Sequence, residues 1–252
     1  MTRALSGKTA IVTGASSGIG RATALKITSL GAAVVVFARR KDRLDELLSE
    51  INAKGGKALA VVGNAGVSSG VDALMNQALN WEGGGRKIDI VVVNAGRGLA
   101  GGILDSDESQ WRSLFEVNVL GAAYLMRIAA QYMKERKSGD IVAIGSVVGR
   151  NVSPFSGFYG SSKFAVAGIV EGLRREVCAH GIRVSLVQPG VVVSEFQNVA
   201  GYTEENFGKG VAQFGKLLEP RDIAEGICWL LALPPHVNVN EIMIRPTGQT
   251  YP

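Results

Sequence analysis

The chain has few cysteines and no long apolar run, and each of these shortages excludes a class of protein. Its two cysteines, Cys178 and Cys228, are too few for a disulfide framework or a cysteine-based metal site. No apolar stretch approaches the roughly 18 residues of a membrane span, and no apolar signal core follows the first charged residue. We therefore expect a cytoplasmic protein with no bound metal.

Charge is also sparse. Charged residues make up 19% of the chain and hydrophobic residues 46%, which is typical of a globular enzyme and unlike a disordered chain. The net charge is +5, and the densest basic cluster (Arg39, Arg40, Lys41 and Arg43) is too short for a nucleic-acid-binding face. This cluster either opens a solvated helix or holds a phosphate group. The expected partner is a small molecule, with neither nucleic acid nor membrane.

Short apolar runs rich in β-branched residues alternate with longer helical patterns. The expected strands are Thr9–Val12, Ala33–Phe37, Ala58–Val62, Ile88–Val93, Asp140–Ile144, Arg183–Val187 and Glu241–Ile244. The expected helices are Gly18–Leu30, Asp42–Lys54, Val67–Trp81, Glu108–Lys137, Tyr159–His180 and Pro220–Leu233. Strands that are apolar on both faces indicate a parallel sheet covered on both sides. The alternation predicts an α/β fold with one doubly wound sheet, in a single domain over residues 1–252.

One connection is much longer than the others. Residues 194–218 include four aromatic side chains, Phe196, Tyr202, Phe207 and Phe214. Loops of this length are usually functional lids or disordered segments, and the aromatic content favours a lid over a pocket.

A glycine-rich turn, TGASSGIG, follows the first expected strand at Thr13 to Gly20. Gly14, Gly18 and Gly20 permit a tight turn and let backbone N–H groups approach a pyrophosphate at the start of the next helix. Their spacing, G-x-x-x-G-x-G, differs from the commoner nucleotide-binding pattern, so an ordinary glycine turn is the alternative interpretation.

The end of the second expected strand predicts which dinucleotide is bound. An acidic residue at this point would bond a free ribose 2′-hydroxyl, but the chain has Arg39 and Arg40 after Ala38. Arginine can hold a 2′-phosphate through paired, charge-assisted hydrogen bonds. The predicted cofactor is NADP(H), and surface arginines at a helix start are the alternative.

Tyr159 and Lys163 stand four residues apart in YGSSK, so they share one face of a helix. A phenol ordinarily titrates near ~10. A neighbouring cation favours the phenolate and is expected to lower that pKa toward the range of acid–base catalysis. Together with a nucleotide-binding turn, the pair points to hydride transfer at a carbonyl or an alcohol.

Several short motifs occur in a characteristic order: TGASSGIG, VNAG at Val93 to Gly96, Asn118, Ser146, YGSSK, and Pro189-Gly190. With these motifs the chain resembles the short-chain dehydrogenase/reductase family over essentially its full length, especially NADP-dependent carbonyl reductases and alcohol dehydrogenases. The resemblance implies a single-domain Rossmann fold with a seven-stranded sheet. It also implies a homotetramer or homodimer.

The resemblance implies a catalytic set of four residues, Asn118, Ser146, Tyr159 and Lys163. Tyr159 would protonate the carbonyl oxygen, and Lys163 would lower the tyrosine pKa and bond the nicotinamide ribose. Ser146 would donate a hydrogen bond to the substrate oxygen, and Asn118 would open a water path to the lysine. Taken singly, Asn118 also fits a satisfied core amide and Ser146 a turn residue.

The family pattern also places the ligands. The implied cofactor-binding set is Gly14, Ser16, Ser17, Gly18, Ile19, Gly20, Arg39, Arg40, Asn64, Ala65, Asn94, Ala95, Gly96, Tyr159, Lys163, Pro189, Gly190, Val192 and Ser194. The expected substrate contacts are Ser146, Val148, Asn151, Phe155 and Tyr159, with Val147, Val152 and Phe158 also lining the pocket. Asn64 stands where an aspartate is usual in the family, and Ser194 where a threonine is frequent.

These expectations define an oxidoreductase that transfers a hydride between NADPH and the carbonyl of a ketone or 3-oxo compound. A 3-oxoacyl-thioester reductase and a 3-hydroxy acid dehydrogenase are alternatives of the same class. A non-catalytic NADP(H) sensor is the alternative from another class, and the retained catalytic side chains argue against it. The largely apolar expected lining favours a substrate with a hydrophobic arm.

Overall fold

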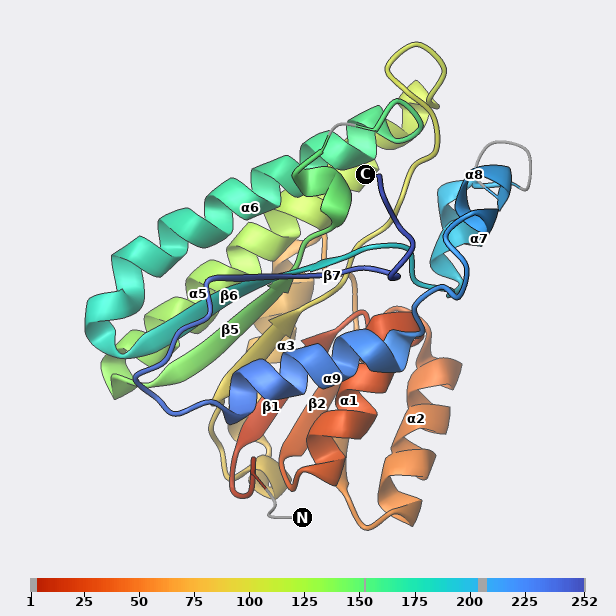
Figure 1. Ribbon diagram of the computed structural model, residues 1–252. Helices are drawn as coiled ribbons and strands as arrows, with labels where there is room; N and C mark the ends of the chain where they lie inside the picture. The colour runs from red at the N-terminus through yellow and green to blue at the C-terminus, as the bar shows by residue number, and fades with distance from the viewer. Residues whose placement is uncertain (1–3, 152, 204–207, 252) are drawn as a thin grey trace.

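The centre of the structure is a seven-stranded parallel sheet (Figure 1). This computed structural model describes residues 4–151, 153–203 and 208–251. The strands are β1 (Thr9–Thr13), β2 (Ala33–Ala38), β3 (Lys57–Val62), β4 (Ile90–Val93), β5 (Gly139–Ile144), β6 (Ile182–Pro189) and β7 (Glu241–Ile244). Their order across the sheet is β3-β2-β1-β4-β5-β6-β7, which confirms the predicted doubly wound sheet.

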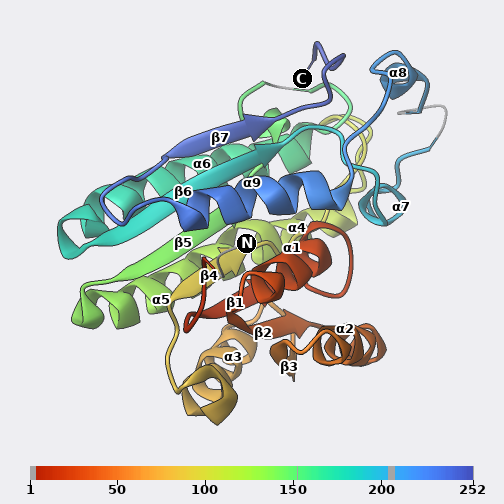
Figure 2. The ribbon, with the colours of Figure 1, turned by 60° about the horizontal axis from the view of Figure 1, so that its bottom comes forward.

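Helices cover both faces of the sheet (Figure 2). One face carries α1 (Gly18–Ser29), α2 (Lys41–Ala53) and α9 (Pro220–Ala232). The opposite face carries α3 (Ser68–Asn80), α5 (Ala122–Arg136) and α6 (Gly157–Val177). Among the described residues there are also the short α-helices α4 (Trp111–Phe115), α7 (Phe196–Ala200) and α8 (Lys209–Ala212).

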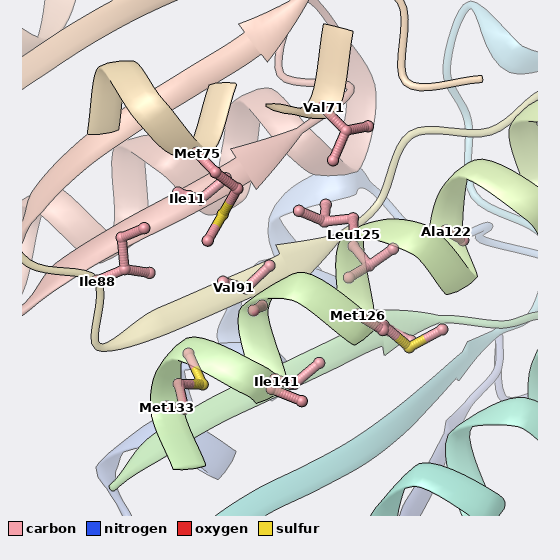
Figure 3. Packing of buried hydrophobic residues seen from close by; sticks show 14 of the residues in the cluster. Ile11, Val71, Met75, Ile88, Val91, Ala122, Leu125, Met126, Met133 and Ile141 are labelled. Atoms are coloured by element: carbon pink, nitrogen blue, oxygen red, sulfur yellow. The ribbon is translucent and has the colours of Figure 1, made fainter. Parts of the chain in front are cut away.

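The central strands are buried on both sides because successive side chains enter opposite cores. Ile11 of β1 belongs to the cluster under α3 and α5, whereas its neighbours Ala10 and Val12 belong to the cluster under α1 and α9. Figure 3 shows the first of these cores, where Met75 and Leu125 approach the sheet beside Ile11. This two-sided burial explains why the strands read as continuous apolar runs.

The helix expected at Glu108–Lys137 is present as an unbroken helical segment over Glu108–Arg136, but its hydrogen-bonding pattern changes along its length. A 3₁₀ turn at Glu108–Gln110 leads into α4, and a π-helical turn at Glu116–Gly121 separates α4 from α5. The π turn presses against the connection after β3, since a Cβ on Gly121 would overlap the Ala65 carbonyl oxygen. Such turns often mark functional positions, and this one contains Asn118.

Taken as one unit, Glu108–Arg136 is long and apolar enough to cross a membrane by length and composition. A buried core helix meets the same criterion, so this segment does not contradict the sequence expectation. Half of the most apolar window is buried inside the molecule, and Leu125, Met126 and Met133 belong to the core beneath the sheet. This packing accounts for the apolar face of the helix.

The strand order reverses between β1 and β4, and open α/β sheets bind ligands in the crevice at such a point. β1 connects through α1 to β2 on one side and pairs with β4 on the other. The segment that follows β6 leaves this same carboxyl edge and forms α7 and α8 above it (Figure 1). The fold therefore brings the glycine turn and the expected lid to one place.

Gly121→Ala tests the close contact at the π turn. The new methyl group would have to displace the Ala65 backbone, so we expect a loss of about 1–3 kcal/mol in unfolding free energy, as for other overpacked sites. Urea unfolding measures it. Gly172→Ala in α6 is the control, because its Cβ meets nothing within 4 Å, and it should not destabilise the protein. Equal stability of the two variants would contradict the contact.

Candidate active site

A cavity of about 700 Å³ lies at the carboxyl edge of the sheet. It is lined by residues from the turn after β1, from the ends of β2, β4, β5 and β6, from α6 and from the lid segment. Within the part of the chain that the structure describes, it brings together almost all the side chains singled out in the sequence. The two halves of the site are a cleft around the glycine turn and a pocket around Tyr159.

The glycine turn is held tightly against the end of β4. Gly14 has a φ of +66°, and a Cβ there would lie 2.8 Å from the Asn94 side-chain nitrogen. Asn94 Nδ2 donates to the Thr13 carbonyl at 2.8 Å, and the backbone N–H of Asn94 donates to the Thr13 hydroxyl at 3.0 Å. Only glycine fits this left-handed, crowded position. Asn94 is thus a structural tie between β1 and β4 that also lines the cavity.

The first turn of α1 faces the cavity and has the features of an anion-binding site. Ser17 precedes the helix and makes no side-chain capping hydrogen bond, and the first turn contains no acidic residue. Ser16, Ser17, Gly18 and Ile19 all line the cavity. Backbone N–H groups at a helix N-terminus favour a phosphate, so this turn fits the pyrophosphate of a dinucleotide.

Two arginines continue the cleft beyond β2. Arg39 and Arg40 both line the cavity, and both are exposed. The Arg40 guanidinium donates to the Ser16 hydroxyl from Nη2 at 3.0 Å and pairs with the Glu195 carboxylate at 2.9 Å. No carboxylate follows β2 before Asp42. The end of β2 therefore presents positive charge where an acidic residue would favour a ribose hydroxyl.

Tyr159 lies at the centre of the pocket, with only 8% of its surface exposed. Its hydroxyl interacts with the side chain of Ser146, and its ring centroid lies 5.5 Å from that of Phe196 in the lid segment. Ser146 follows β5 with an extended backbone and caps a short 3₁₀ turn at Val147–Gly149. A phenol and a hydroxyl therefore meet in one buried, aromatic-walled space.

Lys163 lies one helical turn from Tyr159 and is 7% exposed. Its ammonium donates to the Ile144 carbonyl at 2.8 Å and lies 5.8 Å from the centroid of the Tyr159 ring. Burial lowers the pKa of Lys163 to about 8. The buried lysine can therefore gain and lose a proton close to neutral pH.

The expected lowering of the Tyr159 pKa is wrong for the protein alone. Burial raises this pKa above its ordinary value, against a smaller lowering by the hydrogen bond to Ser146. A cation about 6 Å away is worth roughly 2 pK units at an effective dielectric constant of about 20. Full burial of a phenol can raise its pKa by up to ~3–5 units, so burial dominates.

Asn118 stands behind the cavity and is a fully bonded core amide. Its side-chain oxygen accepts from the Arg97 N–H at 2.9 Å, and its nitrogen donates to the Arg97 carbonyl at 2.9 Å and to the Ser162 hydroxyl at 3.0 Å. Ser162 in turn donates to the Tyr159 carbonyl at 2.7 Å. Asn118 therefore connects the π turn to the loop after β4 and to the start of α6.

Most of the remaining predicted cofactor residues line the cavity. They are Asn64, Ala65, Ala95, Gly96, Pro189, Gly190, Val192 and Ser194. Gly20 does not line it. A Cβ on Gly20 would overlap the Gly14 carbonyl oxygen and lie 2.5 Å from Asn94 Nδ2, so this glycine allows packing rather than ligand contact.

Only some of the residues expected to contact the substrate line the cavity. Val147, Val148 and Phe155 line the cavity, whereas Asn151 does not. Phe158 turns away and stacks on Trp111 with ring centroids 4.3 Å apart. Val152 and Phe207 lie outside the described residues.

Sequence reasoning missed several residues on the substrate side. Tyr202 lines the pocket and interacts with the Ser156 side chain, and burial raises its pKa above the ordinary value. The chain end also reaches the cavity, where Gln249 accepts from the Val191 N–H at 3.0 Å. Other missed lining residues are Arg97, Ser153, Glu195, Gln197, Val199, Val211, Gln213, Thr250 and Tyr251. The aromatic residues at 194–218 were the one signal that could have found Tyr202.

The family model for short chain dehydrogenases matches residues 8–205. The chain therefore belongs to the short-chain dehydrogenase family. Its relatives include uncharacterized oxidoreductases of Staphylococcus epidermidis (33% identical over 239 residues, covering 95% of this chain and 97% of the relative) and of Staphylococcus aureus strain N315 (36% over 242 residues, 96% and 98%). The protein is an oxidoreductase of this family.

Solved structures with the same fold include several nicotinamide complexes. A serine dehydrogenase complexed with NADP+ superposes with a TM-score of 0.85 at 29% identity, covering 96% of each chain. An alcohol dehydrogenase from the archaeon Thermococcus sibiricus, complexed with 5-hydroxy-NADP, has a TM-score of 0.84 at 28% identity and covers 97% of this chain and 99% of that chain. These likenesses support a nicotinamide cofactor in the cleft.

The buried lysine predicts a particular dependence of stability on pH. Folding lowers the pKa of Lys163 to about 8 from ~10.4 in an unfolded chain, so the folded state binds fewer protons between these values. The penalty for burying the ammonium is fully present below about pH 8 and disappears as the pH rises toward ~10. Relative to Lys163→Met, the native chain should gain unfolding free energy from pH 7 to pH 9.5. A constant difference in urea unfolding across this range would refute the depressed pKa.

Proposed function

We propose that this oxidoreductase is an NADPH-dependent carbonyl reductase that also runs in reverse as an alcohol dehydrogenase. The observation that carries the proposal is the buried cluster of Ser146, Tyr159 and Lys163 beside the glycine-turn cleft, in one continuous cavity. Bound NADPH supplies the hydride for reduction. The protein supplies the proton, the orientation and the exclusion of water.

The side chains divide the work at the substrate oxygen. The Tyr159 hydroxyl donates its proton to the carbonyl oxygen as negative charge develops there. Ser146, which lines the same cavity as Tyr159, donates a hydrogen bond to the same oxygen. In the alcohol-oxidising direction Tyr159 must take a proton, and the positive charge of Lys163 nearby favours its phenolate.

The cofactor assignment rests on this chain's own donor groups. The uncapped first turn of α1 would hold the pyrophosphate, and Arg39 and Arg40 would hold the 2′-phosphate of NADP(H). Lys163 and the residues after β4 and β6 would hold the nicotinamide end. A preference for NADP(H) over NAD(H) follows from the positive charge at the end of β2.

The substrate proposal is a ketone or 3-oxo compound. Val148, Phe155, Phe196 and Phe214 supply apolar walls for a hydrophobic arm. The hydroxyls of Ser153, Ser156 and Tyr202 add a polar side that the sequence did not predict. A polar side of this kind would also suit a more polar substrate. A 3-hydroxy acid dehydrogenase and a 3-oxoacyl-thioester reductase are therefore the alternative functions.

We also propose that the protein is cytoplasmic and forms a homotetramer or homodimer. Leu120 beside α5 and Phe164 on α6 are apolar side chains with 63% and 42% of their surfaces exposed. They lie within the helices expected at Glu108–Lys137 and Tyr159–His180. Covering such side chains is a common reason for self-association.

Tyr159→Phe tests the proton donor. Removing the hydroxyl should lower kcat for NADPH-dependent ketone reduction by about 10²- to 10⁴-fold, the usual contribution of a general acid. NADPH binding, followed by its fluorescence, should change little because the ring remains. Tyr124→Phe is the matched control. Tyr124 lies on α5 outside the cavity, and its hydroxyl donates a hydrogen bond to Asp72 of α3 at 2.7 Å. Substantial activity in the Tyr159 variant would reject the role.

Arg39→Asp tests the cofactor preference. The carboxylate would repel a 2′-phosphate and accept a hydrogen bond from a free ribose hydroxyl. The ratio of kcat/KM for NADPH to that for NADH should fall at least about tenfold, the loss of one charge-assisted bond. Arg43→Asp is the control, because Arg43 belongs to the same basic cluster but does not line the cavity. An unchanged ratio in the Arg39 variant would disprove the assignment.

A further inference from the structure

The cleft contains a carboxylate that the catalytic proposal does not use. Glu195 follows Ser194 at the start of the lid segment, immediately before α7, and lines the cavity. Its carboxylate pairs with Arg40 Nη2 at 2.9 Å and lies close enough to the Ser17 side chain to interact with it. One anionic side chain thus bridges the end of β2 and the start of α1.

These contacts resemble those that a phosphate would seek. Glu195 contacts a guanidinium and the residue that precedes an uncapped helix N-terminus, and both groups favour an anion. The positive charge of Arg43 also acts on it. The pKa of Glu195 is lowered, chiefly by the hydrogen bond from Arg40, so the carboxylate is charged at neutral pH.

We propose that Glu195 is a specificity-determining residue that competes with the 2′-phosphate of the dinucleotide for Arg40. The inference rests on the proposed use of NADP(H). When the phosphate binds, Arg40 must exchange the Glu195 carboxylate for the phosphate, and the remaining carboxylate repels it. Glu195 therefore weakens the binding of phosphorylated dinucleotides and reduces the preference that the arginines create.

The size of this effect follows from the exposure of the pair. The Arg40 and Glu195 side chains are 43% and 48% exposed, so solvent screens their attraction. An exposed ion pair of this kind changes an equilibrium by about two- to fivefold. The expected effect is thus a tuning of cofactor preference rather than its reversal.

Glu195→Gln isolates the charge, and two nucleotides isolate the 2′-phosphate. Adenosine 2′,5′-bisphosphate and adenosine 5′-monophosphate differ only in that group, and calorimetry measures both on the full chain without any turnover. The variant should bind the bisphosphate about two- to fivefold more tightly at low salt and bind the monophosphate with its original affinity.

Two further variants make the measurement specific. Glu46→Gln removes the same charge from a residue that pairs with Arg43 at 3.2 Å but does not line the cavity, so its effect should be smaller. In an Arg40→Gln background, Glu195→Gln should tighten the bisphosphate less, because only the repulsion between the carboxylate and the phosphate remains to be removed. A gain of the same size without Arg40 overturns the inference.

The outcomes separate this inference from the proposed function. Equal affinity of the native chain for both nucleotides refutes the proposed preference for NADP(H). The Glu195→Gln variant then tests the competition separately. If the variant prefers the bisphosphate to the monophosphate, the competition is supported, and if it still binds both equally, the competition is overturned. An unchanged or weaker affinity for the bisphosphate, or equal tightening of both nucleotides, also overturns it.

Discussion

The close contact between the turn after β1 and the end of β4 is the constraint on which the whole site depends. Side chains at Gly14 or Gly20 would collide with backbone atoms or with the Asn94 amide, and Asn94 itself bonds the Thr13 carbonyl. The contact holds the N-terminus of α1 beside the point where the strand order reverses. Every group proposed to hold the dinucleotide is positioned from that edge.

Burial in the pocket sets the pKa values of Tyr159 and Lys163. The same desolvation raises the pKa of Tyr159 and lowers that of Lys163 to about 8, since each shift disfavours the charged form. At neutral pH Tyr159 is therefore neutral, whereas most Lys163 side chains still carry their proton because this pH lies below their pKa of about 8. The Ile144 carbonyl accepts a hydrogen bond from this ammonium and holds it in place.

The lid segment joins the two halves of the cavity. Glu195 reaches the arginine at the cofactor end, and the next residue, Phe196, packs near the Tyr159 ring at the substrate end. The Ala100 N–H donates to the Ala200 carbonyl at 2.8 Å, which fastens α7 to the loop after β4. This short stretch of chain therefore contacts both the cleft around the glycine turn and the pocket around Tyr159.

The sequence alone determined the parallel, doubly wound sheet, the glycine turn and the Tyr159–Lys163 pair, because strand burial and helical spacing are local patterns. Only the tertiary structure decided that Asn118 is a bonded core amide in a π turn, that Phe158 faces Trp111, and that Tyr202 and Gln249 reach the pocket. These contacts join residues far apart in the chain. The direction of the Tyr159 pKa shift likewise required the burial of the ring, which spacing along a helix does not reveal.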